Sequence, residues 1–251
     1  MEFFDCNILY GIAATKCSLM PVPDVQTLQI EMKKAGVAKA MVRREEQIIG
    51  AVVIGNQIVA NDVKGSDNLW GVWSIIPDYT HEIPGPDTML AQMKANRIAA
   101  WQLTPTMHGF PLHYRPLKPW LELASEACIP IIIKLGSGIV DTELYDILER
   151  FPNLVIIIST ESVWPSDRAV RPLLMEFPNC YFELSQYLTD GGIEELVNFC
   201  GPQKLLFGTG FYESHFGGIM MMLKHAQICD ADKQLIASKN IIRIIEGIKY
   251  D

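Results

Sequence analysis

Short apolar runs recur along the chain and alternate with longer amphipathic stretches. Most of the runs are bounded by Gly, Pro, Asp or Asn, which is typical of β-strands. Two of them, at 129–136 (IPIIIKLG) and 153–160 (NLVIIIST), are almost entirely apolar and rich in β-branched residues, as parallel strands buried on both faces are. The pattern predicts eight strands, at residues 3–10, 37–42, 69–76, 98–103, 130–135, 154–159, 180–184 and 204–207.

The stretches between these strands have the pattern of amphipathic helices. The first, at 25–34, follows Asp24, a candidate N-cap, and ends shortly before Gly36, a candidate C-cap. Eight strands that alternate with helices predict a single-domain (β/α)8 TIM barrel over residues 1–251. A doubly wound sheet is the main alternative, although it rarely has eight evenly spaced strands. The other helices are predicted at 87–95, 117–128, 141–150, 167–175, 192–200, 218–229 and 233–247.

Composition and charge narrow the classes of function. The 251 residues include 21 Lys+Arg and 29 Asp+Glu, a formal charge of −8, and 49% are hydrophobic. This composition is typical of a globular core and excludes a disordered chain. The basic residues form no stripe interleaved with aromatic residues, so we expect no nucleic-acid partner. No apolar run approaches the roughly 20 residues of a membrane span, and the N-terminus has no basic region, so we expect no membrane partner and no signal peptide.

The cysteines also bear on the compartment. None of them forms a CxxC pair, and Cys128 stands directly before the apolar run IPIII. This spacing predicts buried, reduced thiols in a cytoplasmic protein rather than disulfides or a metal cluster. The six cysteines are at positions 6, 17, 128, 180, 200 and 229.

Five segments together resemble the amidohydrolase-related family of TIM-barrel metal-dependent hydrolases. Their order and spacing agree with the family over nearly the whole chain. The resemblance implies the barrel fold, with an active site at the C-terminal ends of the strands. It also implies a metal-activated water, held by two histidines on strand 1, one each on strands 5 and 6, and an aspartate on strand 8. The segments are FFDCNILYG at 3–11, AGVAKAMV at 35–42, FPNLVIIIST at 151–160, KLLFGTGF at 204–211 and SKNIIRIIEG at 238–247.

None of the five metal-ligand positions of that family carries a metal ligand here. Leu9 has no donor atom, Gly210 has no side chain, and Lys134 would place an ammonium where the cation should lie. Zinc and related metals need imidazole, thiolate or carboxylate groups. We therefore expect no metal and no cofactor, and the resemblance favours the fold but not the usual mechanism. The five positions are Asn7, Leu9, Lys134, Thr160 and Gly210.

Lys134 leaves three interpretations open. It follows three isoleucines, so we expect its stem to be buried, where an ammonium needs a partner. It would be a structural cation paired with Asp5, Glu161 or Glu183, an anchor for a carboxylate or phosphate, or a Schiff-base nucleophile toward a carbonyl substrate.

Two loops carry further candidates. The loop after the fourth strand, TPTMHGFPLHYRP, holds His108, His113 and Arg115, and Arg115 is a candidate for bidentate binding of a carboxylate. The alternative is a packed surface loop. The loop after the eighth strand, GTGFYESHFGG, holds Glu213 and His215, an acid–base candidate pair, and its glycines precede a helix that would bind phosphate.

These features predict an amidohydrolase-like barrel that has lost its metal site and binds a small anionic molecule at the C-terminal mouth. The alternative is a metal-independent hydrolase or lyase that uses Lys134 with a carboxylate or His215. The three adjacent methionines at 220–222 indicate either core packing or a homo-oligomer interface. The expected ligand-binding residues are Asp5, Asn7, His108, His113, Arg115, Thr160, Glu161, Glu183 and Glu213.

Overall fold

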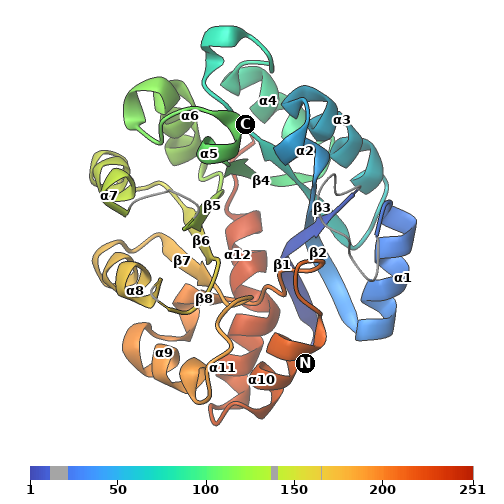
Figure 1. Cartoon of the computed structure of the whole chain (residues 1–251), viewed down its shortest axis with the longest axis vertical. Coiled ribbons are helices and arrows are strands. Elements are labelled where there is room, and N and C mark those ends of the chain that lie inside the picture. The colour runs from blue at the N-terminus through green and yellow to red at the C-terminus, as the bar shows by residue number, and fades with distance from the viewer. Residues whose placement is uncertain (12–21, 137–140, 165, 251) are drawn as a thin grey trace.

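The chain forms a closed barrel of eight parallel strands in sequential order (Figure 1). The computed structural model describes residues 1–11, 22–136, 141–164 and 166–250. The barrel closes beyond the last strand, where Cys6 N donates to Phe207 O over 3.0 Å and Ile8 pairs in parallel with Phe211. The predicted (β/α)8 barrel is confirmed, and the doubly wound alternative is wrong. The strands are β1 (Phe3–Tyr10), β2 (Val37–Arg44), β3 (Leu69–Ser74), β4 (Ile98–Leu103), β5 (Ile131–Leu135), β6 (Ile156–Thr160), β7 (Cys180–Glu183) and β8 (Leu205–Leu206).

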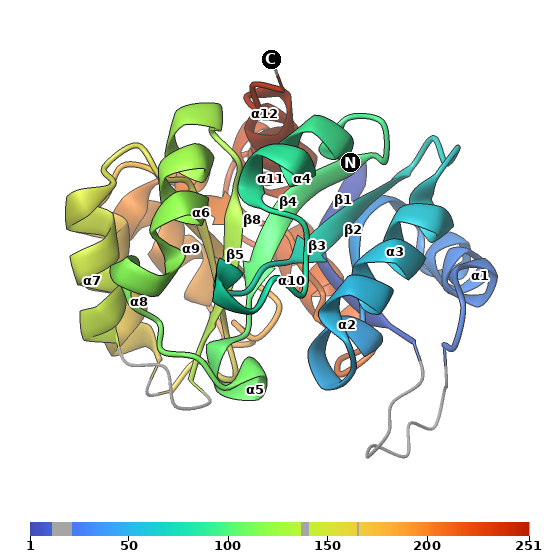
Figure 2. The ribbon, with the colours of Figure 1, turned by 90° about the horizontal axis from the view of Figure 1, so that it is seen from above.

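Helices surround the sheet, as Figures 1 and 2 show. None in the described part of the chain is long and apolar enough to cross a membrane. Asp24 caps α1 by accepting a 2.7 Å hydrogen bond from Thr27 N, and Gly36 ends it with a φ of 80°, as predicted. The helices are α1 (Val25–Ala35), α2 (Glu46–Ile49), α3 (Val52–Val63), α4 (Pro86–Met93), α5 (Pro105–His108), α6 (Tyr114–Ala127), α7 (Asp141–Arg150), α8 (Asp167–Glu176), α9 (Gly192–Cys200), α10 (Gly217–His225), α11 (Asp230–Gln234) and α12 (Asn240–Glu246).

Several elements differ from the predicted ones. The helices α2, α3 and α5 were not expected, and α3 (VVIGNQIVANDV) lacks a clear apolar stripe because apolar residues occur on most of its faces. The single helix predicted at 233–247 is divided into α11, a π-helical turn at Leu235–Lys239, and α12. Short 3₁₀ helices lie at Asp78–Thr80 (η1) and Pro202–Lys204 (η2).

The interior of the barrel is closed at its N-terminal end. Ile241 and Ile244 of α12 pack with strand residues, and the helix crosses the middle of the ring in Figure 1. Asn240 Nδ2 donates to Leu205 O over 2.9 Å, at the start of β8. In the described part of the chain, α12 therefore covers the end of the barrel opposite the carboxyl ends of the strands. The strand residues in this buried cluster include Phe4, Met41, Val72, Ile132, Ile157 and Leu206.

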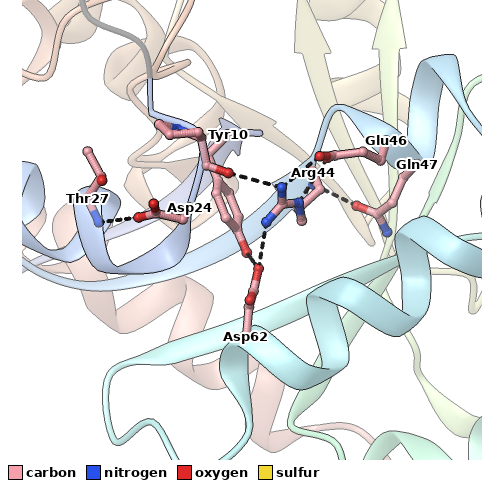
Figure 3. Close-up of polar contacts among 8 residues, drawn as sticks. Tyr10, Asp24, Thr27, Arg44, Glu46, Gln47 and Asp62 are labelled. Atoms are coloured by element: carbon pink, nitrogen blue, oxygen red, sulfur yellow. Dashed lines mark hydrogen bonds and ion pairs between the residues drawn. The ribbon is translucent and has the colours of Figure 1, made fainter. Parts of the chain in front are cut away.

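A polar network ties the end of the first two strands to α3 (Figure 3). Asp62 of α3 accepts hydrogen bonds from Tyr10 Oη at 2.6 Å and from Arg44 Nη1 at 2.9 Å. Arg44 also pairs with Glu46 at 2.7 Å, and its backbone N–H donates to the buried Gln47 side chain. These bonds fix the turn after β2, so α2 is held at the rim of the barrel.

The described cysteines, 6, 128, 180, 200 and 229, all carry free thiols, and Cys17 lies outside the described residues. Burial raises the pKa of Cys6, and it raises the pKa of Cys180 to about 12, so both thiols are protonated at neutral pH. Of the three adjacent methionines, Met220 is buried in the core and Met221 is exposed.

Candidate functional site

A cavity of about 340 Å³ opens at the C-terminal ends of the strands. It is lined from the ends of β1, β2, β4, β5 and β6 and from the segments after β7 and β8. All five positions that correspond to the family's metal ligands line it, as the predicted register requires: Asn7, Leu9, Lys134, Thr160 and Gly210. We call this cavity the mouth.

Arg43, which we did not single out from the sequence, places its guanidinium in the mouth. Its Nη1 donates to Gln102 Oε1 at 3.1 Å, and its Nη2 donates to Asn7 Oδ1. Both partners are neutral amides, and within the described chain the buried Nε has no hydrogen-bond partner. Burial lowers the pKa of Arg43, but a guanidinium stays charged at any physiological pH. Arg43 therefore gives the mouth a cation that still has unused N–H donors.

Strand periodicity could have identified Arg43. Side chains two apart in a strand share a face, and Met41, two residues earlier, belongs to the barrel interior. Arg43 therefore lies in phase with the inward-facing residues of β2. Arg44 alternates to the outer face, where it joins the network with Asp62.

Lys134 also lines the mouth, but its partner differs from those expected. Its Nζ lies 3.3 Å from Glu213 Oε2, in the loop after β8, and its side chain is 40% exposed. The expected pairing with Asp5, Glu161 or Glu183 is therefore wrong. Lys134 lies near the C-terminal end of β5, where Glu213 in the loop after β8 reaches it. Asp5 and Glu183 lie deeper, beneath the mouth.

Two buried carboxylates form the floor beneath the mouth. Asp5 accepts hydrogen bonds from Asn7 N at 2.9 Å, Thr209 N at 3.0 Å and Thr209 Oγ1 at 2.5 Å. Glu183 accepts from Asn7 Nδ2 and Ser185 N, both at 2.9 Å, and from Ser185 Oγ at 2.8 Å. Burial raises the pKa of Asp5 to about 6 and that of Glu183 to about 7, although these hydrogen bonds oppose the rise.

These side chains do not fit a divalent metal ion. In the described ranges, no group of three or more His, Cys, Asp or Glu is arranged to hold one. Each oxygen of Asp5 and Glu183 already accepts a hydrogen bond, and the Asn7 oxygen faces the Arg43 cation. A cation such as zinc or manganese would need several free anionic or imidazole donors in one place.

The structure places four of the predicted residues away from the mouth. The His108 ring bonds to Thr104 Oγ1 at 3.0 Å and to Gln47 O at 2.9 Å, outside the cavity. His113 caps α6 by accepting from Arg115 N, and Arg115 is exposed beside Tyr114. His215 is exposed and does not line the mouth either. Of the other predicted residues, Asn7, Lys134, Thr160, Glu161 and Glu213 line the mouth, while Asp5 and Glu183 lie beneath it.

The mouth combines charged and apolar groups. Arg43 and Lys134 supply its two cations, Glu45, Glu161 and Glu213 supply carboxylates, and Leu9, Ile132 and Phe211 give it apolar walls. The carboxylate of Glu45 accepts a 2.5 Å hydrogen bond from Tyr212 Oη at the rim. This arrangement can hold an anion attached to an apolar body.

Comparison with known proteins agrees with the fold. An uncharacterised TIM-barrel protein from Bordetella bronchiseptica is 18% identical, with a TM-score of 0.77 over 98% of this chain and 99% of that one. A 2,6-dihydroxybenzoate decarboxylase from Rhizobium is 12% identical, with a TM-score of 0.75 over 98% of each chain. A dihydroxybenzoic acid decarboxylase from Polaromonas, solved with bound manganese and an inhibitor, is 13% identical, with a TM-score of 0.71 over 98% of this chain and 97% of that one.

Likeness at such low identity shows the fold alone. No curated protein sequence matches the chain. The family model described as amidohydrolase matches residues 24–246, which is nearly the whole chain. This protein therefore belongs to the amidohydrolase family.

Proposed function

We propose that this protein binds a small carboxylate with an apolar body at the barrel mouth, without a metal ion and with little or no metal-dependent hydrolase activity. The observation that carries the proposal is Arg43, a cation in the lining of the mouth whose two hydrogen-bond partners are neutral amides. A guanidinium has five N–H donors, and hydrogen bonds to ionised partners are about twice as strong as neutral ones. A bound carboxylate would use the donors that the protein leaves free.

The size and lining of the mouth support this class of ligand. Its volume of about 340 Å³ is near the lower end of small-molecule sites, which span roughly 300–1,000 Å³. Lys134 adds a second positive charge, which Glu213 balances while the site is empty. The apolar walls favour a ring or branched chain over a bare inorganic anion.

The names of two similar structures suggest which probe to use first. Both are named as decarboxylases of dihydroxybenzoic acids, which are aromatic carboxylates. An aromatic carboxylate of that kind combines an anionic group with an apolar ring. For this reason 2,6-dihydroxybenzoate is the probe that we choose.

The donor set in the mouth supports binding without a metal. In the position where the family places a strand-1 histidine, the Asn7 carboxamide oxygen receives a hydrogen bond from Arg43. A divalent cation next to this guanidinium would be repelled by a like charge. The protein therefore uses Arg43 as the fixed positive charge of the site.

The rival proposal is a metal-independent hydrolase or lyase that uses Lys134. The ion pair with Glu213 favours an anchoring role, because a nucleophilic amine must be unprotonated and an adjacent carboxylate stabilises the ammonium. His215 does not line the mouth and offers no base near Lys134. Borohydride trapping of a carbonyl ligand on the wild type, absent in Lys134→Met, would favour the rival.

Calorimetric titration with 2,6-dihydroxybenzoate in the presence of a chelator tests the proposal. We expect the wild type to bind and Arg43→Met to bind at least tenfold more weakly, which corresponds to one charge-assisted interaction of about 1.5–3 kcal/mol. Arg115→Met is the matched control, since Arg115 is exposed outside the mouth. Equal affinity of the wild type and Arg43→Met would overturn the proposal.

A further inference from the structure

A second, more open cavity lies beside the mouth on the same end of the barrel. It has a volume of about 520 Å³ and is formed by α2, the start of α3, the segment after β3 with η1, and α5. Figure 2 shows α2 and α5 on the same side of the barrel, where the two helices are in contact. We call it the groove, and the apolar side chains in its walls include Val52, Ile76, Pro77, Tyr79 and Phe110.

Three side chains line both cavities and form the ridge between them. They are Ile48 and Ile49 of α2 and Met107 of α5. Ile49 is 44% exposed and Met107 is 59% exposed, so the top of the ridge is apolar and open to solvent. A methionine side chain is flexible and adapts to what packs on it. A ligand in the mouth can therefore extend over an apolar ridge.

The base of the ridge is fixed. The His108 ring of α5 bonds to the backbone oxygen of Gln47 in α2 at 2.9 Å and to Thr104 Oγ1 at 3.0 Å. The Gln47 side chain is itself buried and donates to Val72 O at 2.8 Å. The two short helices thus keep their positions, and only the tips of the apolar side chains are free to adjust.

The groove has no group that would bind an anion. Its ionisable side chains are Tyr79, Glu82 and His108. Burial lowers the pKa of His108, so its ring is neutral at pH 7. Tyr79 is 77% exposed, and Ile49 and Met107 are exposed as well. Clustered exposed apolar residues of this kind mark a binding surface.

We propose that the groove binds the apolar tail of an amphipathic carboxylate whose head group Arg43 holds in the mouth. This inference rests on the proposed function, because the head group is assigned to that site. It adds the substrate class: a carboxylate extended by an alkyl or aryl chain long enough to cross the ridge. Continuity across Ile48, Ile49 and Met107 supports one ligand that occupies both cavities.

A series of unbranched carboxylates tests this inference. Butanoate, hexanoate, octanoate and decanoate are titrated against the wild-type protein, with 2,6-dihydroxybenzoate as the head-group probe. Each methylene that becomes buried strengthens binding by up to about fourfold. We therefore expect affinity to rise through decanoate, and a plateau at the shortest members would overturn the inference.

A charge in the groove separates its contribution from that of the mouth. In Tyr79→Asp, we expect decanoate to bind at least tenfold more weakly, while 2,6-dihydroxybenzoate binds as in the wild type. Met175→Asp is the matched control, because Met175 is an exposed apolar residue on α8 that lines neither cavity. An equal loss for decanoate in both variants, or no loss in either, would show that the groove does not hold the tail.

Two further outcomes distinguish the possible failures. If 2,6-dihydroxybenzoate binds through Arg43 but chain length has no effect, the groove inference fails and the proposed function stands. If no carboxylate depends on Arg43, the proposed function itself fails. Sedimentation analysis tests whether a second copy of the chain occupies the groove instead. A wild-type dimer that dissociates in Tyr79→Asp would show that it does, and would overturn the inference.

Discussion

Asn7 donates a 2.9 Å hydrogen bond from its side-chain nitrogen to Glu183 Oε1, in the floor beneath the mouth. Its side-chain oxygen at the same time accepts a hydrogen bond from Arg43. The carboxamide therefore joins a buried carboxylate to the guanidinium, and each group holds the next in place. This chain of contacts positions Arg43 in the mouth.

Removing the carboxamide should affect both stability and binding. Asn7→Ala leaves Glu183 with its Ser185 contacts and removes one of the two acceptors that position Arg43. We expect a loss of about 1–3 kcal/mol in the free energy of unfolding, measured by urea denaturation. Affinity for 2,6-dihydroxybenzoate should fall as well. Asn96→Ala is the control, since the Asn96 side chain bonds only at the surface, and an equal effect of the two substitutions would contradict the assignment.

The pH dependence of stability should reveal Glu183. Its pKa is raised from the ordinary 4.5 to about 7, so the folded state binds its proton more tightly than the unfolded state. The stabilisation from this proton is complete below about pH 4.5 and is lost as the pH rises through 7. The full loss corresponds to about 3 kcal/mol.

Glu183→Gln isolates this contribution from those of the other carboxylates. We expect the free energy of unfolding of the wild type to exceed that of this variant by less and less as the pH rises. The measurement is denaturation at pH values from 4.5 to 8. Glu176→Gln is the control at an exposed position, and its curve should run parallel to that of the wild type. A constant difference between the wild type and Glu183→Gln would show that Glu183 keeps the same charge across this range.

Gly208 should be sensitive to any side chain. A Cβ at this position would lie 2.3 Å from Glu183 Oε2 and 3.0 Å from the Cβ of Asn7. Because the buried carboxylate is held by three hydrogen bonds, it cannot move aside cheaply, and Gly208→Ala should cost about 1–3 kcal/mol. Gly217→Ala is the matched control, since its Cβ would meet nothing within 4 Å. Equal melting temperatures for the two variants would refute the crowding.

Two arginine ion pairs should differ in their contribution to stability. Arg44, with a nearly buried side chain, pairs with Asp62 and Glu46, whereas Arg150 pairs with Asp146 at the surface. We expect Arg44→Met to destabilise the protein by roughly 3 kcal/mol, because it leaves partly buried acids without a cation. Arg150→Met should cost less than about 1 kcal/mol. Equal shifts of the melting temperature in the two variants would contradict this difference.

The sequence was most informative where burial leaves a strong pattern. The strands IPIIIKLG and NLVIIIST are buried on both faces, so their apolar character marks them without any tertiary information. Helix α3 was missed because it is apolar on most faces, and α2 and α5 are single turns set by the bonds of Gln47 and His108. Such contacts join residues far apart in the chain and have no local pattern.

The site was predictable in position but not in detail. The five metal-ligand positions of the family converge at the mouth because strand register fixes them. The partner of Lys134 depends on how far the loop after β8 reaches, and a sequence pattern does not give that distance. Arg43 was identifiable because it lies two residues after the inward-facing Met41 and so shares its face of the strand. Taken together, however, the adjacent pair Arg43-Arg44 is typical of surface charge.

Binding of 2,6-dihydroxybenzoate before and after removal of divalent metals separates binding by Arg43 from binding by a metal ion. The protein is dialysed against a chelator, its zinc, manganese and iron contents are measured, and the titration is repeated with and without added manganese. We expect less than stoichiometric metal before dialysis and the same affinity in all three states. About one metal per chain, with binding lost on chelation and restored by manganese, would contradict it.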